Sequence, residues 1–254
     1  MRLEDVAMLA ANTSRSRAYL QALVRHDLLP SMVLLLPAPS NRLLPGQSDV
    51  SPARPKSAPA HCEDDLWSEA DFDATEPLVE TLERAGILAR TLNRNDINAP
   101  DVIAEIAACR ETVFIYSGYG GTLLGPELLA TGKRFLHVHG GYLPDFKGST
   151  TNYYSLLVDD TLGASSLFLS SEIDSGPVLR RSKFPPPPDR RAIDHVFDAA
   201  ARSKVLVETL RDYAVSGEWR FALTENVGGR TYFIIHPVLK HIAVLSPGAG
   251  DSCE

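Results

Sequence analysis

The chain has 254 residues, 44% of them apolar, which is enough for one large domain or one domain with a small appendage. Its net charge of −7 argues against a nucleic-acid partner, because phosphate binding requires a basic face. Three cysteines without CxxC spacing indicate a reducing compartment, and no leader or membrane-spanning apolar run is recognised, so we expect a cytoplasmic protein without a membrane partner.

The first elements predict a βαβ unit. An apolar run at 6–10 predicts a buried strand, residues 12–14 offer caps for a helix to about Arg25, and residues 31–36 predict a second strand. The first turn lacks a Gly-x-Gly-x-x-Gly pattern, so we infer no nicotinamide site. Residues 37–66 carry six prolines and no periodicity, which predicts a long loop, either an inert linker or a lid over a cleft.

The middle of the chain predicts helices at 76–86 and 100–108 and a central strand at 112–117. This strand runs into the glycine-rich segment 118–126. Glycines at the carboxyl end of a strand let main-chain groups contact a flat ligand, and a flexible connector is the alternative interpretation. A phosphate-binding loop is disfavoured, because no Gly-Lys-Ser/Thr ends the segment.

Two histidines, His137 and His139, share one face of the next strand, because side chains alternate along a strand. They stand at its carboxyl end, directly before a Gly-Gly turn. Residues 164–179 predict a strand, an acidic loop containing Asp174, and another strand. Structural histidines and a turn-forming Asp are the alternative. Together, however, an imidazole and a carboxylate from adjacent strand ends supply the pair that general acid–base chemistry needs.

The segment His-Val-His-Gly-Gly-Tyr-Leu-Pro-Asp-Phe-Lys-Gly at 137–148 resembles the signature of the formyl-tetrahydrofolate-dependent formyltransferases, and the loop at 172–176 resembles their Asp-x-Gly loop. This family includes methionyl-tRNA formyltransferase, glycinamide ribonucleotide transformylase and the sugar N-formyltransferases. The resemblance covers residues 5–185 and implies an α/β, Rossmann-like formyltransferase fold, with a mostly parallel sheet flanked by helices. One departure stands at position 137, where the family carries Asn and this chain carries His.

By this resemblance, His139 and Asp174 are the catalytic pair, and His137 donates to the developing oxyanion in place of the family's Asn. The implied co-substrate is N10-formyltetrahydrofolate. Residues from two loops are expected to bind it: Gly118, Tyr119, Gly120, Gly121, Leu123 and Leu124 from the first, and Ser171, Glu172 and Ile173 from the second. Contacts with the acceptor substrate are expected from Tyr142, Lys147 and Asn152.

We accordingly assign residues 1–185 to a formyltransferase-like catalytic domain that includes the loop at 37–66. Residues 186–245 are expected to form a C-terminal helix, from about 192 to 215, and a small β appendage in which 220–223 and 231–235 make a hairpin or a short appended sheet. Residues 246–254 are expected to form a tail. The apolar C-terminal strand is able to pair across a homodimer.

The residues support three functions. The first is an N-formyltransferase that acts on the amine of a small molecule, such as an amino sugar, a sugar nucleotide or an amino-acid-like metabolite, and that needs no metal. The second is a metal-dependent hydrolase or oxygenase, because His137, His139 and Asp174 form an acceptable two-histidine, one-carboxylate ligand set. The third is a non-catalytic family member that binds folate.

Overall fold

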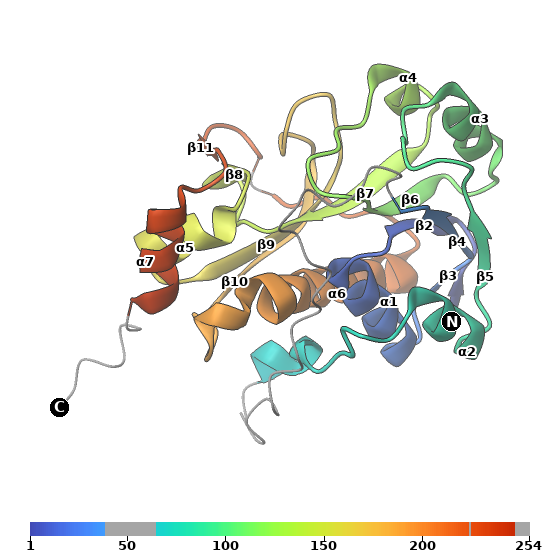
Figure 1. The fold of residues 1–254 in the computed structure, drawn as a ribbon. Helices are drawn as coiled ribbons and strands as arrows, with labels where there is room; N and C mark the ends of the chain where they lie inside the picture. Colours follow the sequence, from blue (N-terminus) through green and yellow to red (C-terminus); the bar gives the residue numbers. More distant parts are fainter. Residues whose placement is uncertain (39–64, 224, 247–254) are drawn as a thin grey trace.

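A seven-stranded sheet forms the centre of the molecule in the computed structural model, which describes residues 1–38, 65–223 and 225–246 (Figure 1). The strands are β2 (Val6–Ala11), β4 (Met32–Leu36), β5 (Leu88–Thr91), β6 (Val113–Ser117), β7 (Arg134–His139), β9 (Leu162–Phe168) and β10 (Val178–Phe184). Their order is β10-β9-β7-β6-β2-β4-β5. Strands β7, β6, β2, β4 and β5 run parallel, whereas β9 is antiparallel to both of its neighbours. The expected α/β fold with a mostly parallel sheet is confirmed.

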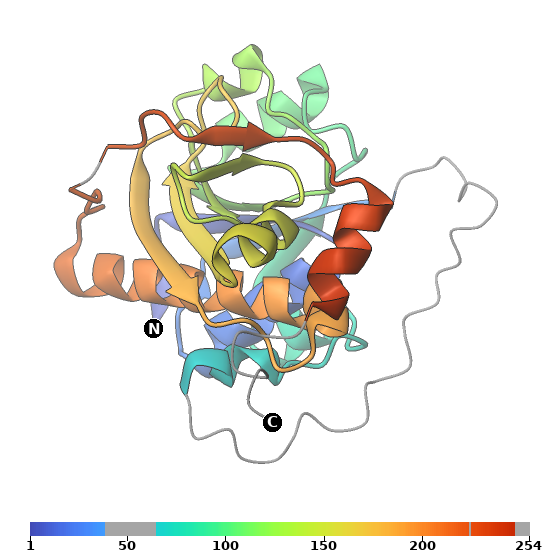
Figure 2. The same ribbon diagram turned by 90° about the vertical axis from the view of Figure 1, so that its left-hand side faces the viewer.

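Helices cover both faces of this sheet (Figures 1 and 2). They are α1 (Ser14–Arg25), α2 (Leu78–Arg84), α3 (Pro100–Ala108), α4 (Pro126–Leu129), α5 (Thr151–Asp159), α6 (Asp198–Ser216) and α7 (Pro237–Leu245). The alternation of β2 explains the layers, because its successive side chains enter two separate cores. Met8 lies in one apolar cluster with Leu20 of α1 and Leu206 of α6. Leu9 lies in another, with Ile106 of α3.

Two short strand pairs lie outside the main sheet: β1 (Arg2–Leu3) with β3 (Leu29–Pro30), and β8 (Phe146–Gly148) with β11 (Arg230–Tyr232). Short helical turns occur at η1 (Asp65–Ala70), η2 (Arg190–Ala192) and η3 (Ile193–Phe197). In the part of the chain that the structure describes, no helix combines the length and apolar character needed to cross a membrane. Residues 39–64 of the expected loop and 247–254 of the expected tail lie outside the described residues.

The C-terminal region differs from the expected appendage in two ways. Helix α6 covers most of the helix predicted at 192–215, but it belongs to the main core, where Val205 and Leu206 are fully buried. The hairpin predicted between 220–223 and 231–235 is wrong, because β11 pairs in parallel with β8 instead. A close approach explains the actual path. A Cβ atom on Gly229 would lie 1.6 Å from the carbonyl oxygen of Pro144, so only glycine lets the chain pass against the turn before β8.

The apolar C-terminal stretch that suggested a homodimer remains at the surface. Phe233 and Ile234 follow β11 and are 81% and 80% exposed. Helix α7, which the sequence reading did not anticipate, exposes further apolar side chains: Val238, Leu239, Ile242 and Leu245. The homodimer stays a prediction.

Candidate active site

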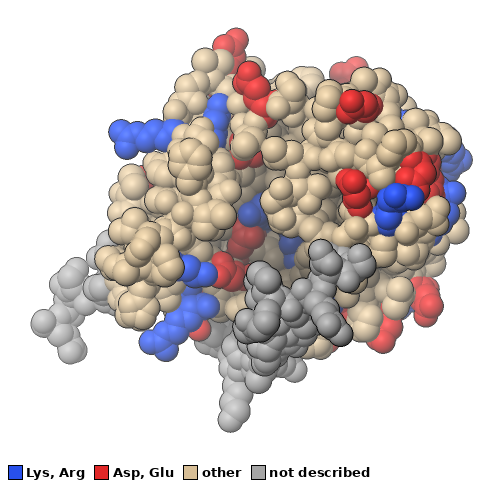
Figure 3. Space-filling model, turned by 45° about the horizontal axis from the view of Figure 1, so that its top comes forward, with Lys and Arg blue, Asp and Glu red and all other residues tan. Residues whose placement is uncertain are grey.

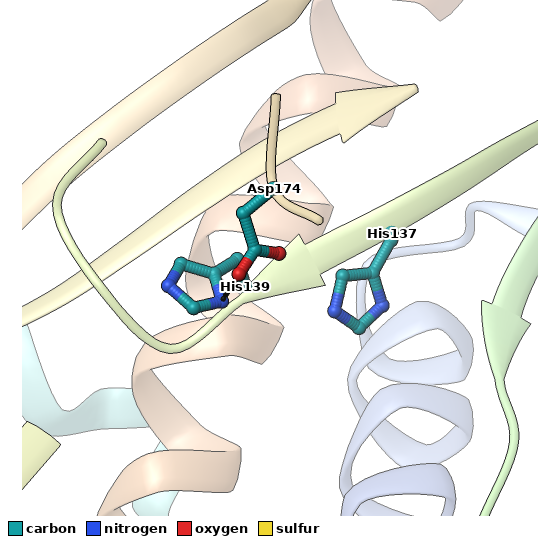
Figure 4. Close-up of side chains that lie close together, drawn as sticks. All are labelled: His137, His139 and Asp174. Carbon is teal, nitrogen blue, oxygen red and sulfur yellow. Dashed lines mark ion pairs between the residues drawn. The ribbon is translucent and has the colours of Figure 1, made fainter. Parts of the chain in front are cut away.

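Strand β7 presents His137 and His139 at its carboxyl end, between β6 and β9. Their rings lie on one side of the strand, as the alternation predicted, and Asp174 reaches them from the loop between β9 and β10 (Figure 4). We call that loop, residues 169–177, the acidic loop. When the top of Figure 1 is turned forward, the molecule is hollowed in its middle, and charged side chains of both signs lie inside the hollow (Figure 3).

The His139 and Asp174 side chains lie in contact and are buried, with 6% and 9% of their surfaces exposed. His139 Nδ1 lies 3.3 Å from Asp174 Oδ2. The other ring nitrogen, Nε2, lies 2.7 Å from the carbonyl oxygen of Phe146, which can only accept, so Nε2 carries a proton. Burial lowers the pKa of His139, and the Asp174 carboxylate and the Phe146 carbonyl act in the opposite direction. The expected catalytic pair is thus brought together and held away from bulk water.

The backbone fixes Asp174 in place. Its φ of 51° is in the left-handed region, which a short polar residue in a turn tolerates. The Gly148 N–H donates to Asp174 Oδ2 at 2.8 Å. The Asn226 amide donates to the carbonyls of Asp174, at 2.7 Å, and of Gly176, at 3.0 Å. Asn226 was not singled out from the sequence, because it lies 52 residues away in a segment with no motif.

His137 lies beside this pair in a different state. Its Nδ1 is 3.5 Å from the carbonyl oxygen of Tyr116 on β6, so Nδ1 carries the proton and the other nitrogen is unprotonated. Figure 4 shows that other nitrogen on the side of His139 and Asp174. Burial, assisted by the charges of Arg15 and Arg202, lowers the pKa of His137 well below its usual value. His137 is therefore a neutral imidazole that faces the site with an acceptor.

Two arginines shape the electrostatics of the site, and the sequence analysis missed both. Arg15, in the first turn of α1, donates to Ser117 Oγ at 3.3 Å and to the Gly118 carbonyl at 2.5 Å. Arg202 of α6 donates to the Val138 carbonyl at 2.8 Å and pairs with Asp198 at 2.8 Å. Arg15 had a usable signal, because it follows β2 at the carboxyl edge of the sheet. Arg202 had none, because only the packing of α6 brings it under β7.

The segment after β6, residues 118–125, is called the glycine loop here. Gly118 is buried and its carbonyl is held by Arg15, while Gly120 and Gly121 are exposed. Tyr119 donates its hydroxyl to the Pro37 carbonyl at 3.2 Å. Both Tyr119 and Leu124 pack against the apolar core on the α3 face, whereas Leu123 is 65% exposed. Three residues of the acidic loop that were also expected to bind folate are exposed: Ser171, Glu172 and Ile173.

The three side chains expected to contact the acceptor have partners within the protein instead. Lys147, only 7% exposed, donates to the Asn226 carbonyl at 3.3 Å. Asn152, also 7% exposed, donates to the Asp198 carboxylate. The Tyr142 ring lies 5.1 Å from Lys183 Nζ, on β10. A turn motif shows that these residues follow the histidines, but not which way each side chain turns, so the three substrate contacts stay predictions.

Comparison with known proteins agrees with this architecture. No family model matches the chain. A methionyl-tRNA formyltransferase from a Roseiflexus species is 30% identical over 142 residues, which are 54% of this chain and 42% of the relative. One from Clavibacter sepedonicus is 29% identical over 126 residues, 49% of this chain and 40% of the relative. The matched segment therefore spans less than half the length of these curated relatives.

Solved structures extend the similarity to nearly the whole chain. A sugar N-formyltransferase from a Shewanella species superposes with a TM-score of 0.55 at 12% identity, over 94% of this chain and 86% of that one. A phosphoribosylglycinamide formyltransferase from Anaplasma phagocytophilum has a TM-score of 0.55 at 13% identity, over 92% and 99%. These similarities agree with the resemblance seen in the sequence motifs: about half of the chain is similar in sequence to methionyl-tRNA formyltransferases, and the chain has the fold of formyltransferases.

Proposed function

We propose that this protein transfers a formyl group from N10-formyltetrahydrofolate to the amine of a small molecule. The observation that carries the proposal is the buried contact of 3.3 Å between His139 and Asp174, at the carboxyl end of a central parallel strand. In open α/β sheets, ligands bind outside the carboxyl ends of the strands. A structural neighbour with a TM-score of 0.51, a sugar 3N-formyltransferase, was solved in the presence of dTDP and 5-N-formyl-THF.

The reaction joins the acceptor nitrogen to the formyl carbon, breaks the bond from that carbon to N10, and moves one proton from the amine to N10. We assign the transfer of this proton to the His139–Asp174 pair, whose contact lets the carboxylate stabilise a transient imidazolium. The Gly148 N–H and the Asn226 amide hold Asp174 so that the pair needs little reorganisation. The products are the N-formyl amine and tetrahydrofolate.

We assign His137 a role that differs from oxyanion donation. The tautomer favoured by the Tyr116 carbonyl leaves an unprotonated nitrogen toward the site, which suits an N–H of the attacking amine better than a developing oxyanion. The low pKa of His137 keeps this nitrogen unprotonated at neutral pH. An Asn at this position presents an amide that both donates and accepts, so the replacement keeps one of its two capacities.

The net charge of the protein bears on the class of the acceptor substrate. We propose an amino sugar, a sugar nucleotide or an amino-acid-like metabolite, because a net charge of −7 opposes a polyanionic nucleic acid. For the pterin, we propose the exposed glycines 120 and 121 of the glycine loop and the exposed segment 171–173 of the acidic loop. Both segments are exposed, and the two glycines carry no side chain that would keep a flat ring from their main chain.

The proposal is tested by measuring binding and transfer separately. Binding of 5-formyltetrahydrofolate is followed by calorimetry, and transfer from N10-formyltetrahydrofolate by the release of tetrahydrofolate with a panel of amines. The variant Asp174→Asn should bind folate as the wild type does but transfer about 10²–10⁴ times more slowly. The control Asp212→Asn removes a carboxylate of the same kind from a surface pair with Arg180 and should transfer normally.

The outcomes separate the competing functions. Absence of folate binding would refute the whole proposal. Tight folate binding with no transfer to any amine would support the non-catalytic alternative, and wild-type rates in Asp174→Asn would remove the His139–Asp174 pair from the mechanism.

A further inference from the structure

The imidazole of His137, at the position where the resemblance implies Asn, adds a metal-binding nitrogen to the site. His137, His139 and Asp174 each offer one ligand atom, and these atoms all lie within 4.8 Å of one another. Within residues 1–38, 65–223 and 225–246, this is the one group of three or more His, Cys, Asp or Glu side chains with such geometry. We propose that the group binds a divalent transition-metal ion, and that Zn²⁺ fits it best.

The first support is the pair of tautomers. Histidines that bind metals usually donate their other N–H to a carbonyl or carboxylate, which fixes the free nitrogen toward the ion. Both histidines do so here: His137 through Nδ1 to the Tyr116 carbonyl, and His139 through Nε2 to the Phe146 carbonyl. Each ring therefore turns its unprotonated nitrogen toward Asp174, although the two use opposite nitrogens.

The second support is the contact between His139 and Asp174. In this tautomer, Nδ1 and the carboxylate oxygen are both acceptors, and at 3.3 Å they repel unless a cation or a proton lies between them. Two ligand atoms of a tetrahedral zinc ion, each about 2.0–2.1 Å from the metal, lie about 3.3 Å apart. The observed spacing is therefore already that of two zinc ligands.

His137 is the ligand that has to adjust. The limit of 4.8 Å is wider than the spacing of tetrahedral ligands, so its ring has to move inward. The structure leaves room for this, because His137 is only partly buried and its bond to Tyr116 is long, at 3.5 Å. By contrast, Asp174 is oriented by the Gly148 N–H and by Asn226, so the carboxylate is preorganised.

The positive charges of two nearby arginines lower the expected affinity for a metal ion. Arg15 is anchored on the Ser117 hydroxyl and the Gly118 carbonyl, and Arg202 is paired with Asp198. Their charges oppose a divalent ion but also favour neutral histidines, which are the forms that bind metals. With three protein ligands, the ion keeps an open position for water or for a ligand oxygen.

One consequence rests on the proposed function. An ion held by His139 and Asp174 occupies the atoms to which we assign proton transfer, so added Zn²⁺ should inhibit formyl transfer. The binding itself does not depend on that function. It would hold equally in a metal-dependent enzyme or in a protein without turnover.

The test uses the full chain after treatment with a chelator. Zn²⁺ is titrated against a competing chromophoric chelator, and Co²⁺ is titrated while the visible d–d bands are recorded. We expect one ion per chain and a tetrahedral Co²⁺ spectrum. His137→Asn, which restores the family's residue, should weaken Zn²⁺ binding at least about 10²-fold, because it removes a ligand outright. His241→Asn removes an exposed histidine of α7 and should leave the affinity unchanged.

Equal binding by wild type and His137→Asn, or no stoichiometric binding by wild type, would overturn the inference. Circular dichroism and binding of 5-formyltetrahydrofolate by His137→Asn show whether the variant is folded. A wild type that binds Zn²⁺ but transfers no formyl group even after the chelator has removed all metal would leave the metal site standing and refute the proposed function. A wild type that transfers formyl groups and ignores Zn²⁺ would do the reverse.

Discussion

The two loops beside the histidines are built on opposite principles. The acidic loop brings a buried carboxylate into the site and holds it through Gly148, Asn226 and His139. The glycine loop keeps Gly120, Gly121 and Leu123 exposed. Each loop is nevertheless clamped by one distant Asn, since Asn98 donates to the Leu123 carbonyl at 2.9 Å and accepts from the Gly125 N–H at 2.6 Å. The acidic loop thus holds one carboxylate in a fixed position, whereas the glycine loop leaves an exposed surface.

The largest difference should appear when a methyl group is added to a glycine of each loop. A Cβ on Gly176 would lie 1.8 Å from the Phe168 carbonyl oxygen, whereas a Cβ on Gly120 would meet nothing within 4 Å. We expect Gly176→Ala to lower the free energy of unfolding by about 3 kcal/mol and Gly120→Ala by about 0.5 kcal/mol or less. Urea unfolding measures both. Similar losses in the two variants would show that the acidic loop is not the more tightly built one.

The next effect concerns the two clamps. Asn226→Ala removes the donors to the Asp174 and Gly176 carbonyls and should cost about 1–3 kcal/mol of stability. Because Asp174 then loses its orientation, kcat for formyl transfer should fall about 10-fold with little change in KM for folate. Asn98→Ala is the matched control, since it releases the glycine loop and should raise KM with kcat nearly unchanged. Steady-state kinetics would contradict the comparison if both variants changed the same constant.

The sequence predicted those features of the loops that depend on residues near one another in the chain. Strand alternation placed His137 and His139 on one face, because that signal is local. The turn motif predicted a loop around Asp174, but the expectation that this loop lies near the histidines rested on the resemblance to the family. The resemblance to a family added the fold. Local signals also explain why β2, α1 and β6 were predicted close to their observed bounds.

Interactions between distant segments escaped prediction. Asn226 and Arg202 reach the site only because β11 adds to β8 and α6 packs under the sheet. The hairpin was predicted from turn residues and failed, because the strand partner of β11 is β8, which lies far away in the sequence. Lys147 illustrates the same limit: its position after the histidines was visible, but its burial against the Asn226 carbonyl was not.

A smaller effect is the pH dependence of stability that comes from His137. The pKa of His137 is lowered well below its usual value, so the unfolded chain takes up a proton first as the pH falls. The stability should therefore be lost below about pH 6.5, by at most about 1.4 kcal/mol per pH unit for this group. His137→Asn should lose less stability over the same range. Urea unfolding at pH 7.5 and pH 5.5, in the presence of a chelator, measures the difference, and identical pH slopes would exclude a lowered pKa of His137.

The smallest effect on stability should come from a substitution of Leu123, and this substitution also tests whether the glycine loop binds folate. An apolar side chain that is 65% exposed on a loop contributes little to folding, so Leu123→Ser should change the free energy of unfolding by no more than about 0.5 kcal/mol. If a pterin covers this side chain, the same variant should weaken binding of 5-formyltetrahydrofolate about 3–10-fold, because part of a leucine's burial, worth about 1.5–3 kcal/mol in full, is lost. The control is Leu88→Ser, which alters a leucine that is 64% exposed on the far edge strand β5. A glycine loop that serves only as a connector would give equal folate affinities in both variants. That result would contradict the proposal that the glycine loop binds folate.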